Sequence, residues 1–297
     1  PFKELELIAS TNQPALVGRG NGYDIFAVRW PVIHTIHGEG LLLVPSNKPI
    51  ANIIAIPDAD VLPEHISGLI EGVPSHSQFA RHLAESGCRV VIPTLISRKS
   101  NEMPNHISKR EWLYRSAFEL GRHLIGYELQ KIFAVVDWFS TQSQDDVKIG
   151  TIGWGEGGML ALYAGAIDTR IDAVCVSGYF NSRQKVWKEP LERNVFGLLT
   201  QFGDAELASM VAPRHLVIEA ADFPEVHVPA GTGGAAPADL VTPSLDQIET
   251  EVERAQSIVN QLNPKPKIEL IQAESSIYGT VESLQSLLDL LSTQATV

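Results

Sequence analysis

Short apolar segments recur along the chain, and from the third one onward they are separated by segments with helical periodicity. The apolar segments are rich in Ile and Val and mostly lack alternation with polar residues. This pattern is typical of strands that are buried on both faces of a sheet. Eight strands are predicted, at 23–30, 40–44, 52–57, 89–94, 147–153, 171–177, 215–220 and 267–273. The first two are close enough in the sequence to form a hairpin.

Helices with one apolar face are predicted between and after these strands. They lie at 77–86, 125–139, 157–166, 244–259 and 284–291. The repetition of strand and helix predicts an α/β fold with a mostly parallel sheet and helices on both faces. No linker or repeat divides the chain, so one domain is predicted over 1–297, with hairpin strands and an N-terminal segment in 1–50.

Two loops leave the carboxyl ends of predicted strands, where open α/β sheets bind their ligands. A polar loop at 98–104 follows the fourth strand. A long loop at 229–243, rich in Gly, Ala and Pro, follows the seventh strand.

Composition and charge exclude several classes of protein. Apolar residues make up 44% of the chain and charged residues 20%, as in ordinary globular proteins. The net charge of −12, from 23 basic and 35 acidic residues, argues against a nucleic-acid partner and favours solubility. No apolar run reaches the roughly 18–20 residues that a membrane span needs. Cys88 and Cys175 are predicted to be buried free thiols, and no histidine pair has metal-ligand spacing.

The beginning of the chain leaves the compartment open. Residue 1 is proline, and no signal-like apolar segment precedes it. We therefore expect a processed or trimmed chain, whose export signal, if it had one, has already been removed.

A Gly-rich turn between the fifth strand and the following helix carries the most chemical information. Gly153, Gly155 and Gly158 match the dinucleotide-binding pattern G-x-G-x-x-G, but no acidic residue ends the next strand and four strands precede the motif. The segment 153–157 also fits the nucleophile elbow G-x-S-x-G, except that Gly155 stands where the nucleophile belongs. Glycine accepts the positive φ of this turn, so the turn can form without a hydroxyl or thiol group. No cofactor is predicted.

Because of this elbow and the order of the eight strands, the chain resembles the α/β-hydrolase superfamily, specifically its dienelactone hydrolase and acetyl xylan esterase-like branch. The segment Ala212-Pro213-Arg214-His215 supports the resemblance, because it looks like the entry to the strand that delivers the acid of the catalytic triad. The resemblance implies a three-layer α/β-hydrolase fold over nearly the whole chain. It also implies carboxylic ester hydrolysis, if the chain is active.

The remaining triad positions are incomplete in this sequence. The acid is expected after the seventh strand, where Asp222 stands, with Glu219 and Glu225 as alternates. The histidine is expected after the eighth strand, but the segment 272–279 contains none. The last histidine of the chain is His227, some forty residues earlier.

Other residues near the elbow are candidates for a replacement site. Glu156 is a candidate general base, although an acidic residue in the first turn of a helix also complements the helix dipole. His227 is a second candidate, on the loop after the seventh strand. Asp58 and Ala59 follow the third strand and are candidate pocket residues, and Asp58 is expected to repel an oxyanion or to form a turn cap or salt bridge.

Two aromatic residues and three serines are further candidates. Trp154 and Tyr179 are expected at strand ends, where they line a pocket or pack in the core. Ser177, Ser275 and Ser276 are alternative hydroxyl donors or turn residues.

Two functions follow from these observations. The first is a catalytically inactive α/β-hydrolase-fold domain that binds a small-molecule or carbohydrate ligand, or that serves as a scaffold for a second hydrolase domain or subunit. The second is a carboxylic ester hydrolase with an unconventional site, acting on acetylated or glucuronoyl-esterified plant polysaccharide. The substrate class comes from the resemblance alone.

Overall fold

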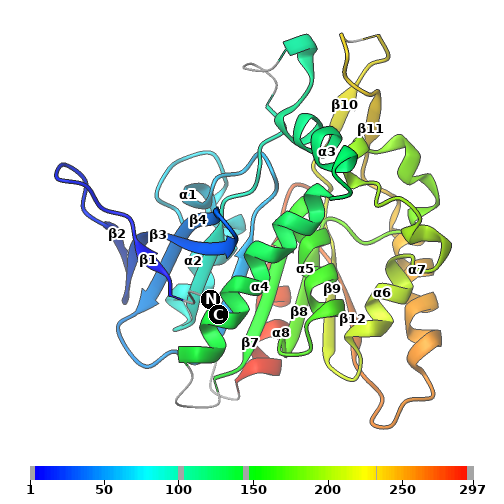
Figure 1. Ribbon diagram of the computed structural model, residues 1–297. Helices are drawn as coiled ribbons and strands as arrows, with labels where there is room; N and C mark the ends of the chain where they lie inside the picture. Colours follow the sequence, from blue (N-terminus) through cyan, green and yellow to red (C-terminus); the bar gives the residue numbers. More distant parts are fainter. Residues whose placement is uncertain (1–3, 100–103, 143–146, 232, 293–297) are drawn as a thin grey trace.

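A ten-stranded sheet runs through the molecule (Figure 1), in a computed structural model that describes residues 4–99, 104–142, 147–231 and 233–292. Along the sheet the order is β1-β3-β4-β6-β5-β7-β8-β9-β12, with β2 also paired to β3. The strands of this sheet are β1 (Glu6–Leu7), β2 (Leu16–Gly20), β3 (Tyr23–Ile33), β4 (Ile36–Pro45), β5 (Asn52–Ile56), β6 (Arg89–Pro93), β7 (Ile149–Trp154), β8 (Ala173–Ser177), β9 (His215–Ala220) and β12 (Ile268–Gln272).

The eight predicted strands correspond to β3 to β9 and β12, and the expected hairpin is β3–β4. The strands from β6 across to β12 are parallel, whereas β1 to β4 run antiparallel to their neighbours. Two short strands, β1 and β2, were not predicted. The predicted loop at 229–243 contains β11 (Ala238–Leu240), which pairs with β10 (Val226–Val228) in a separate hairpin.

Helices cover both faces of the sheet (Figure 1). They are α1 (Pro63–Ile66), α2 (Phe79–Glu85), α3 (Lys109–Glu119), α4 (Leu124–Gln142), α5 (Glu156–Ile167), α6 (Asp204–Val211), α7 (Leu245–Val259) and α8 (Val281–Leu291). Short 3₁₀ helices are η1 (Ser75–Ser77), η2 (Pro104–His106), η3 (Arg183–Lys188), η4 (Leu191–Arg193) and η5 (Leu198–Thr200). The three-layer α/β architecture agrees with the sequence prediction.

Two apolar cores lie on opposite faces of the sheet. One joins the sheet to α4, α5, α6 and α7, and the other joins it to α1, α2 and α8. Because apolar surface stabilises the fold when it is removed from water, the continuous Ile and Val strands are held from both sides. Cys88 and Cys175 are free and buried in the second core, as predicted.

Helices α3 and α6 were not predicted from the sequence. Helix α3 lacks the hydrophobic periodicity that predicts a helix, because the charged residues Arg110 and Glu111 lie on its buried face. Helix α6 has only eight residues. In the described part of the chain, no helix combines the length and apolar character that crossing a bilayer requires.

Candidate functional site

The chain turns sharply between β7 and α5, and glycines make this turn possible. Gly155 has φ +60° and ψ −117°, a conformation that glycine adopts at little cost. A Cβ on Gly153 would lie 2.1 Å from the carbonyl oxygen of Gly157, and a Cβ on Gly157 would lie 2.0 Å from that of Ile56. The backbones of β5, β7 and α5 therefore pack directly against one another here. The turn therefore has the shape of a nucleophile elbow, with glycine at its apex.

Two segments that follow different strands of the sheet close over this apex. A Cβ built on Gly155 would lie 2.6 Å from Cγ of Pro224 and 2.7 Å from Oδ1 of Asp58. Pro224 follows β9 and Asp58 follows β5. A side chain at position 155 therefore needs both neighbours to move, because real Cβ contacts are not this short.

The backbone N–H that follows the apex is already hydrogen-bonded. The N–H of Glu156 donates to Oδ1 of Asp58 at 2.9 Å. In a nucleophile elbow, this N–H is one of the donors that stabilise a developing oxyanion. Here it faces a carboxylate that is also bound by Nη1 and Nη2 of Arg98, at 2.5 and 3.0 Å. Asp58 therefore forms a salt bridge, and its Oδ2 also accepts from the backbone N–H of Asp60 at 3.4 Å, as in a turn cap.

The side chain of Glu156 is fully buried among arginines. Its Oε1 accepts from Nη2 of Arg110 at 2.8 Å, and its Oε2 accepts from Nη1 of Arg193 at 2.8 Å and from Nη2 of Arg98 at 3.2 Å. Burial alone would raise the pKa of this carboxyl, but the surrounding guanidinium groups outweigh it and lower the pKa to about 2. A carboxylate held in this way is a poor proton acceptor near neutral pH, contrary to the suggestion that Glu156 acts as a general base.

The arginines extend this cluster of charges through the interior. Arg110 also binds Glu128 at 3.3 Å, and Arg193 binds Glu189 at 2.7 Å. Arg110 and Arg193 are each exposed by no more than 2%. Breaking one partner of a buried pair leaves an uncompensated charge, which costs about 3–5 kcal/mol. These residues therefore fix the segments around the elbow in one arrangement.

The acid candidate Asp222 lies beside the loop in which a histidine was expected. Oδ2 of Asp222 accepts from Oγ of Ser275 at 2.9 Å and from the backbone N–H of Ser276 at 2.8 Å. Its backbone carbonyl accepts from Nε1 of Trp154 at 2.9 Å. The ends of β9 and β12 thus meet as the sequence implies, but the carboxylate binds a serine and a backbone amide.

The alternate acid Glu219 has a different environment. It is 1% exposed and its Oε2 accepts from Oγ of Ser177 at 2.5 Å and from the N–H of Gly279 at 2.7 Å. Its Oε1 accepts from the N–H of Thr280 at 2.8 Å. Glu219 therefore satisfies donors at the start of α8, whereas Glu225 is exposed on the surface.

The residues expected to line a pocket are dispersed. Tyr179 is fully buried and donates its hydroxyl to Oδ1 of Asp204 at 3.0 Å, so the structure places it in the core and not at a pocket wall. Trp154 stacks on Tyr278, with ring centroids 3.9 Å apart and planes 7° apart. Ala59 lines a small cavity of about 140 Å³ beside the strand ends of β5 and β6.

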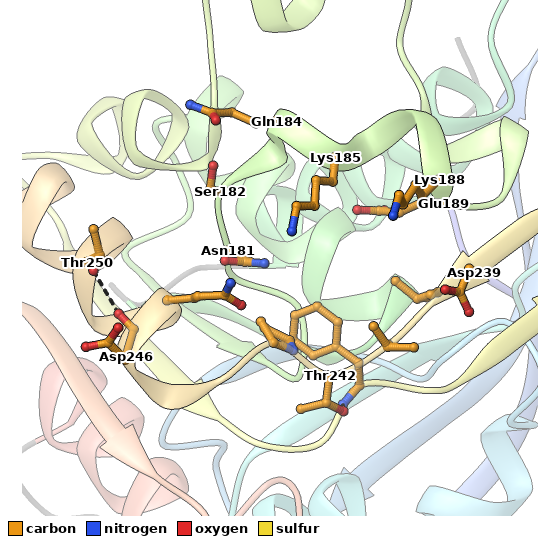
Figure 2. Close-up of a pocket in the computed structure, with 15 residues that line it drawn as sticks. Asn181, Ser182, Gln184, Lys185, Lys188, Glu189, Asp239, Thr242, Asp246 and Thr250 are labelled. Carbon is orange, nitrogen blue, oxygen red and sulfur yellow. Dashed lines mark hydrogen bonds between the residues drawn. The ribbon is translucent and has the colours of Figure 1, made fainter.

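A larger cavity of about 410 Å³ opens at the carboxyl ends of β8 and β9 (Figure 2). Its walls come from the segment 181–189 and from residues 223 and 239–250. Neither Trp154 nor Tyr179 lines it. In the described part of the chain, no group of three or more His, Cys, Asp or Glu residues is placed to hold a metal ion.

Comparison with known proteins identifies the family. Residues 45–196 match the sequence profile of the dienelactone hydrolase family, and they make up just over half of the chain. The chain belongs to the dienelactone hydrolase family. A comparison with curated protein sequences found no match.

Solved structures share the fold of this dienelactone hydrolase-family chain. A Bacteroides fragilis protein provisionally assigned as an acetyl xylan esterase superposes with a TM-score of 0.63 and 17% identity, over 92% of this chain and 70% of that one. A promiscuous CE15 esterase from a marine bacterial metagenome gives 0.57 and 13%, over 98% and 86%. A glucuronoyl esterase from Solibacter usitatus gives 0.56 and 10%, over 99% and 86%. At these identities the likeness concerns the fold alone.

No histidine among the described residues of this family member forms a nucleophile–base pair. All nine are among the described residues, and none of them shares a hydrogen bond with a Ser or Thr hydroxyl or a Cys thiol there. His227 lies on β10, where Nδ1 is 3.4 Å from Oδ1 of Asp239 and the side chain is 73% exposed.

Sequence reasoning missed the residues that surround the elbow most closely. Arg98, Arg110 and Arg193 come from three separate segments, and Pro224 comes from a fourth. One usable indication was present, because Arg98 lies in the polar loop predicted after the fourth strand. The other two arginines gave none, since an arginine in sequence is expected to be solvated.

Proposed function

We propose that this chain is a member of the dienelactone hydrolase family that does not carry out acyl transfer, and that its α/β-hydrolase fold serves in binding. One observation carries the proposal. The place of a nucleophile above Gly155 is taken by Pro224 and Asp58, each within 3 Å of where a Cβ would stand. Acyl transfer by this fold needs a nucleophile, a base and oxyanion donors in one space, and that space is filled.

The electrostatics of the elbow support the same proposal. A tetrahedral intermediate develops negative charge near the N–H of Glu156, which donates to the Asp58 carboxylate instead. Two negative oxygens would compete for one donor. Removing a single oxyanion donor costs about 10²–10³ in kcat, so occupation of this one is a large barrier even before the missing nucleophile is counted.

The position expected for histidine supports it independently. Asp222, the residue at the acid position, binds Ser275 and the amide of Ser276. A serine hydroxyl hydrogen-bonded to a carboxylate has no imidazole to accept its proton near neutral pH. Ser275 is nevertheless an exposed hydroxyl that is bound to the residue at the acid position, Asp222. Ser275→Ala is therefore the control variant in the experiment.

The experiment measures hydrolysis of p-nitrophenyl acetate by the wild-type chain and by Ser275→Ala. We expect both proteins to give the rate of an equal concentration of bovine serum albumin or less, with no difference between them. A saturable turnover that Ser275→Ala abolishes would refute the proposal. It would instead support the second candidate, a carboxylic ester hydrolase with an unconventional site at the ends of β9 and β12.

A further inference from the structure

The larger cavity lies next to the closed elbow but is walled off from it. Phe223 lines the cavity, and the following residue, Pro224, lies against Gly155. The backbone N–H of Phe223 donates to Oγ1 of Thr242 at 2.9 Å, and Thr242 lines the cavity as well. One short segment therefore closes the elbow on one side and forms a fixed wall of the cavity on the other.

The volume and lining of this cavity suit a small polar molecule. About 410 Å³ falls within the range of small-molecule sites in proteins. Phe223, Leu240 and Pro243 supply apolar wall. Six lining side chains are neutral and hydrogen-bonding, namely Asn181, Ser182, Gln184, Thr242, Gln247 and Thr250, and five are charged, namely Lys185, Lys188, Glu189, Asp239 and Asp246. Such a mixture of flat apolar surface and neutral polar groups suits a ligand that carries several hydroxyl groups.

One cation in the cavity has no partner among the described residues. Lys185, on η3, extends toward Asn181 in Figure 2, and no described side chain or carbonyl accepts a hydrogen bond or ion pair from its ammonium group. The neighbouring acid Glu189 is bound by Arg183 and Arg193, at 2.6 and 2.7 Å. The second lysine, Lys188, lies 5.3 Å from the ring centroid of Trp187.

Two acceptors in the same cavity are also without partners. Oδ1 of Asn181 is buried and accepts no hydrogen bond from any described residue. Asp246, in the first turn of α7, is exposed, and its carboxylate has no donor among the described residues; Thr250 donates to its backbone carbonyl. For the buried acceptor of Asn181, the missing donor costs free energy, which a bound donor would recover. A complementary ligand therefore has donors for these two groups and an anionic group for Lys185.

We propose that this cavity binds a polyhydroxylated carboxylate, whose carboxylate pairs with Lys185 and whose hydroxyl groups donate to Asn181 and Asp246. This inference rests on the proposed function, because it assigns a ligand to a fold that serves in binding. No bond of the ligand is broken in this site.

Titration calorimetry with sodium D-gluconate tests the proposal, with D-glucose and hexanoate as the matched ligands that lack the carboxylate and the hydroxyl groups. We expect saturable binding of gluconate and at least about tenfold weaker binding of the other two. Lys185→Met should weaken gluconate binding at least about tenfold, and Lys185→Arg should retain most of it. Lys265→Met is the control, because Lys265 is exposed before the amino end of β12, at the opposite edge of the sheet.

Three results would overturn the inference: no gluconate binding, equal binding of glucose, or unchanged binding by Lys185→Met. Ester hydrolysis is measured on the same samples, so the two proposals fail separately. Gluconate binding together with saturable ester turnover would refute the proposed function and leave this site. Absence of both would refute this site and leave the proposed function.

Discussion

Placing a serine at the apex of the elbow tests whether the space above Gly155 is filled. Gly155→Ser puts a Cβ within 3 Å of Pro224 and Asp58, in a backbone conformation that L-residues rarely adopt. The strained conformation costs about 1–3 kcal/mol. Overpacking against two fixed neighbours costs a further 1–3 kcal/mol or so. We therefore expect the variant to be less stable by about 2–6 kcal/mol.

This loss is large enough to measure by thermal unfolding. With an unfolding entropy of about 2 cal/mol/K per residue, it corresponds to a decrease in Tm of about 3–10 °C for 297 residues. Gly121→Ser is the matched control, because Gly121 also has positive φ, +68°, but a Cβ there would meet nothing within 4 Å. The control places a side chain at a positive φ without the steric contacts.

The steric part can be isolated by a second substitution. Pro224→Ala removes Cγ and Cδ, which are two of the three atoms nearest to a Cβ on Gly155. In a double-mutant cycle, Gly155→Ser should be less destabilising in the Pro224→Ala background, with a coupling of about 0.5–3 kcal/mol. If Gly155→Ser is no worse than Gly121→Ser, or if the cycle gives no coupling, the apex is open and the reasoning fails.

Three further predictions concern the carboxylates of the site. Glu156→Gln should destabilise the fold by about 3–5 kcal/mol near neutral pH; because the pKa of Glu156 is lowered to about 2, the difference from wild type in urea unfolding should shrink as the pH falls from about 4.5 towards 2. Burial raises the pKa of Asp204 to about 7, so its contribution to stability is full below about pH 4 and is lost as the pH rises to about 7; the stability of Asp204→Asn relative to wild type should therefore increase between about pH 4 and 7 in the same assay. Asp222→Ala should leave Tm within about 2 °C, because the contact is exposed, but should speed amide hydrogen exchange at Ser276; unchanged exchange would contradict the contact.

Periodicity in the sequence located the sheet because its strands are buried on both faces. The runs of Ile and Val in β5, β6 and β8 have no alternative environment in a globular domain. The turn at Gly155 could also be predicted from the sequence, because local backbone conformation determines it. The side chains around the turn could not be predicted, since they come from distant segments that meet only in the fold.

Most of the site residues that could not be predicted from the sequence are charged residues that the fold buries. Arg110 is fully buried on the inner face of α3, and its partners Glu128 and Glu156 lie on two other helices. Each of these residues alone would be expected at the surface. Only the assembled fold shows that their charges compensate one another, and only the assembled fold shows that Tyr179 donates to Asp204 in the core.

We propose that the elbow has no attacking atom within reach of an acyl carbon. Intact-protein mass spectrometry after incubation with an excess of a fluorophosphonate measures this, because the reagent adds one covalent group to any activated serine. We expect the wild-type chain to keep its unmodified mass while a serine hydrolase in the same tube is labelled to completion. Stoichiometric labelling of the wild-type chain at a single residue would show that an attacking atom is present.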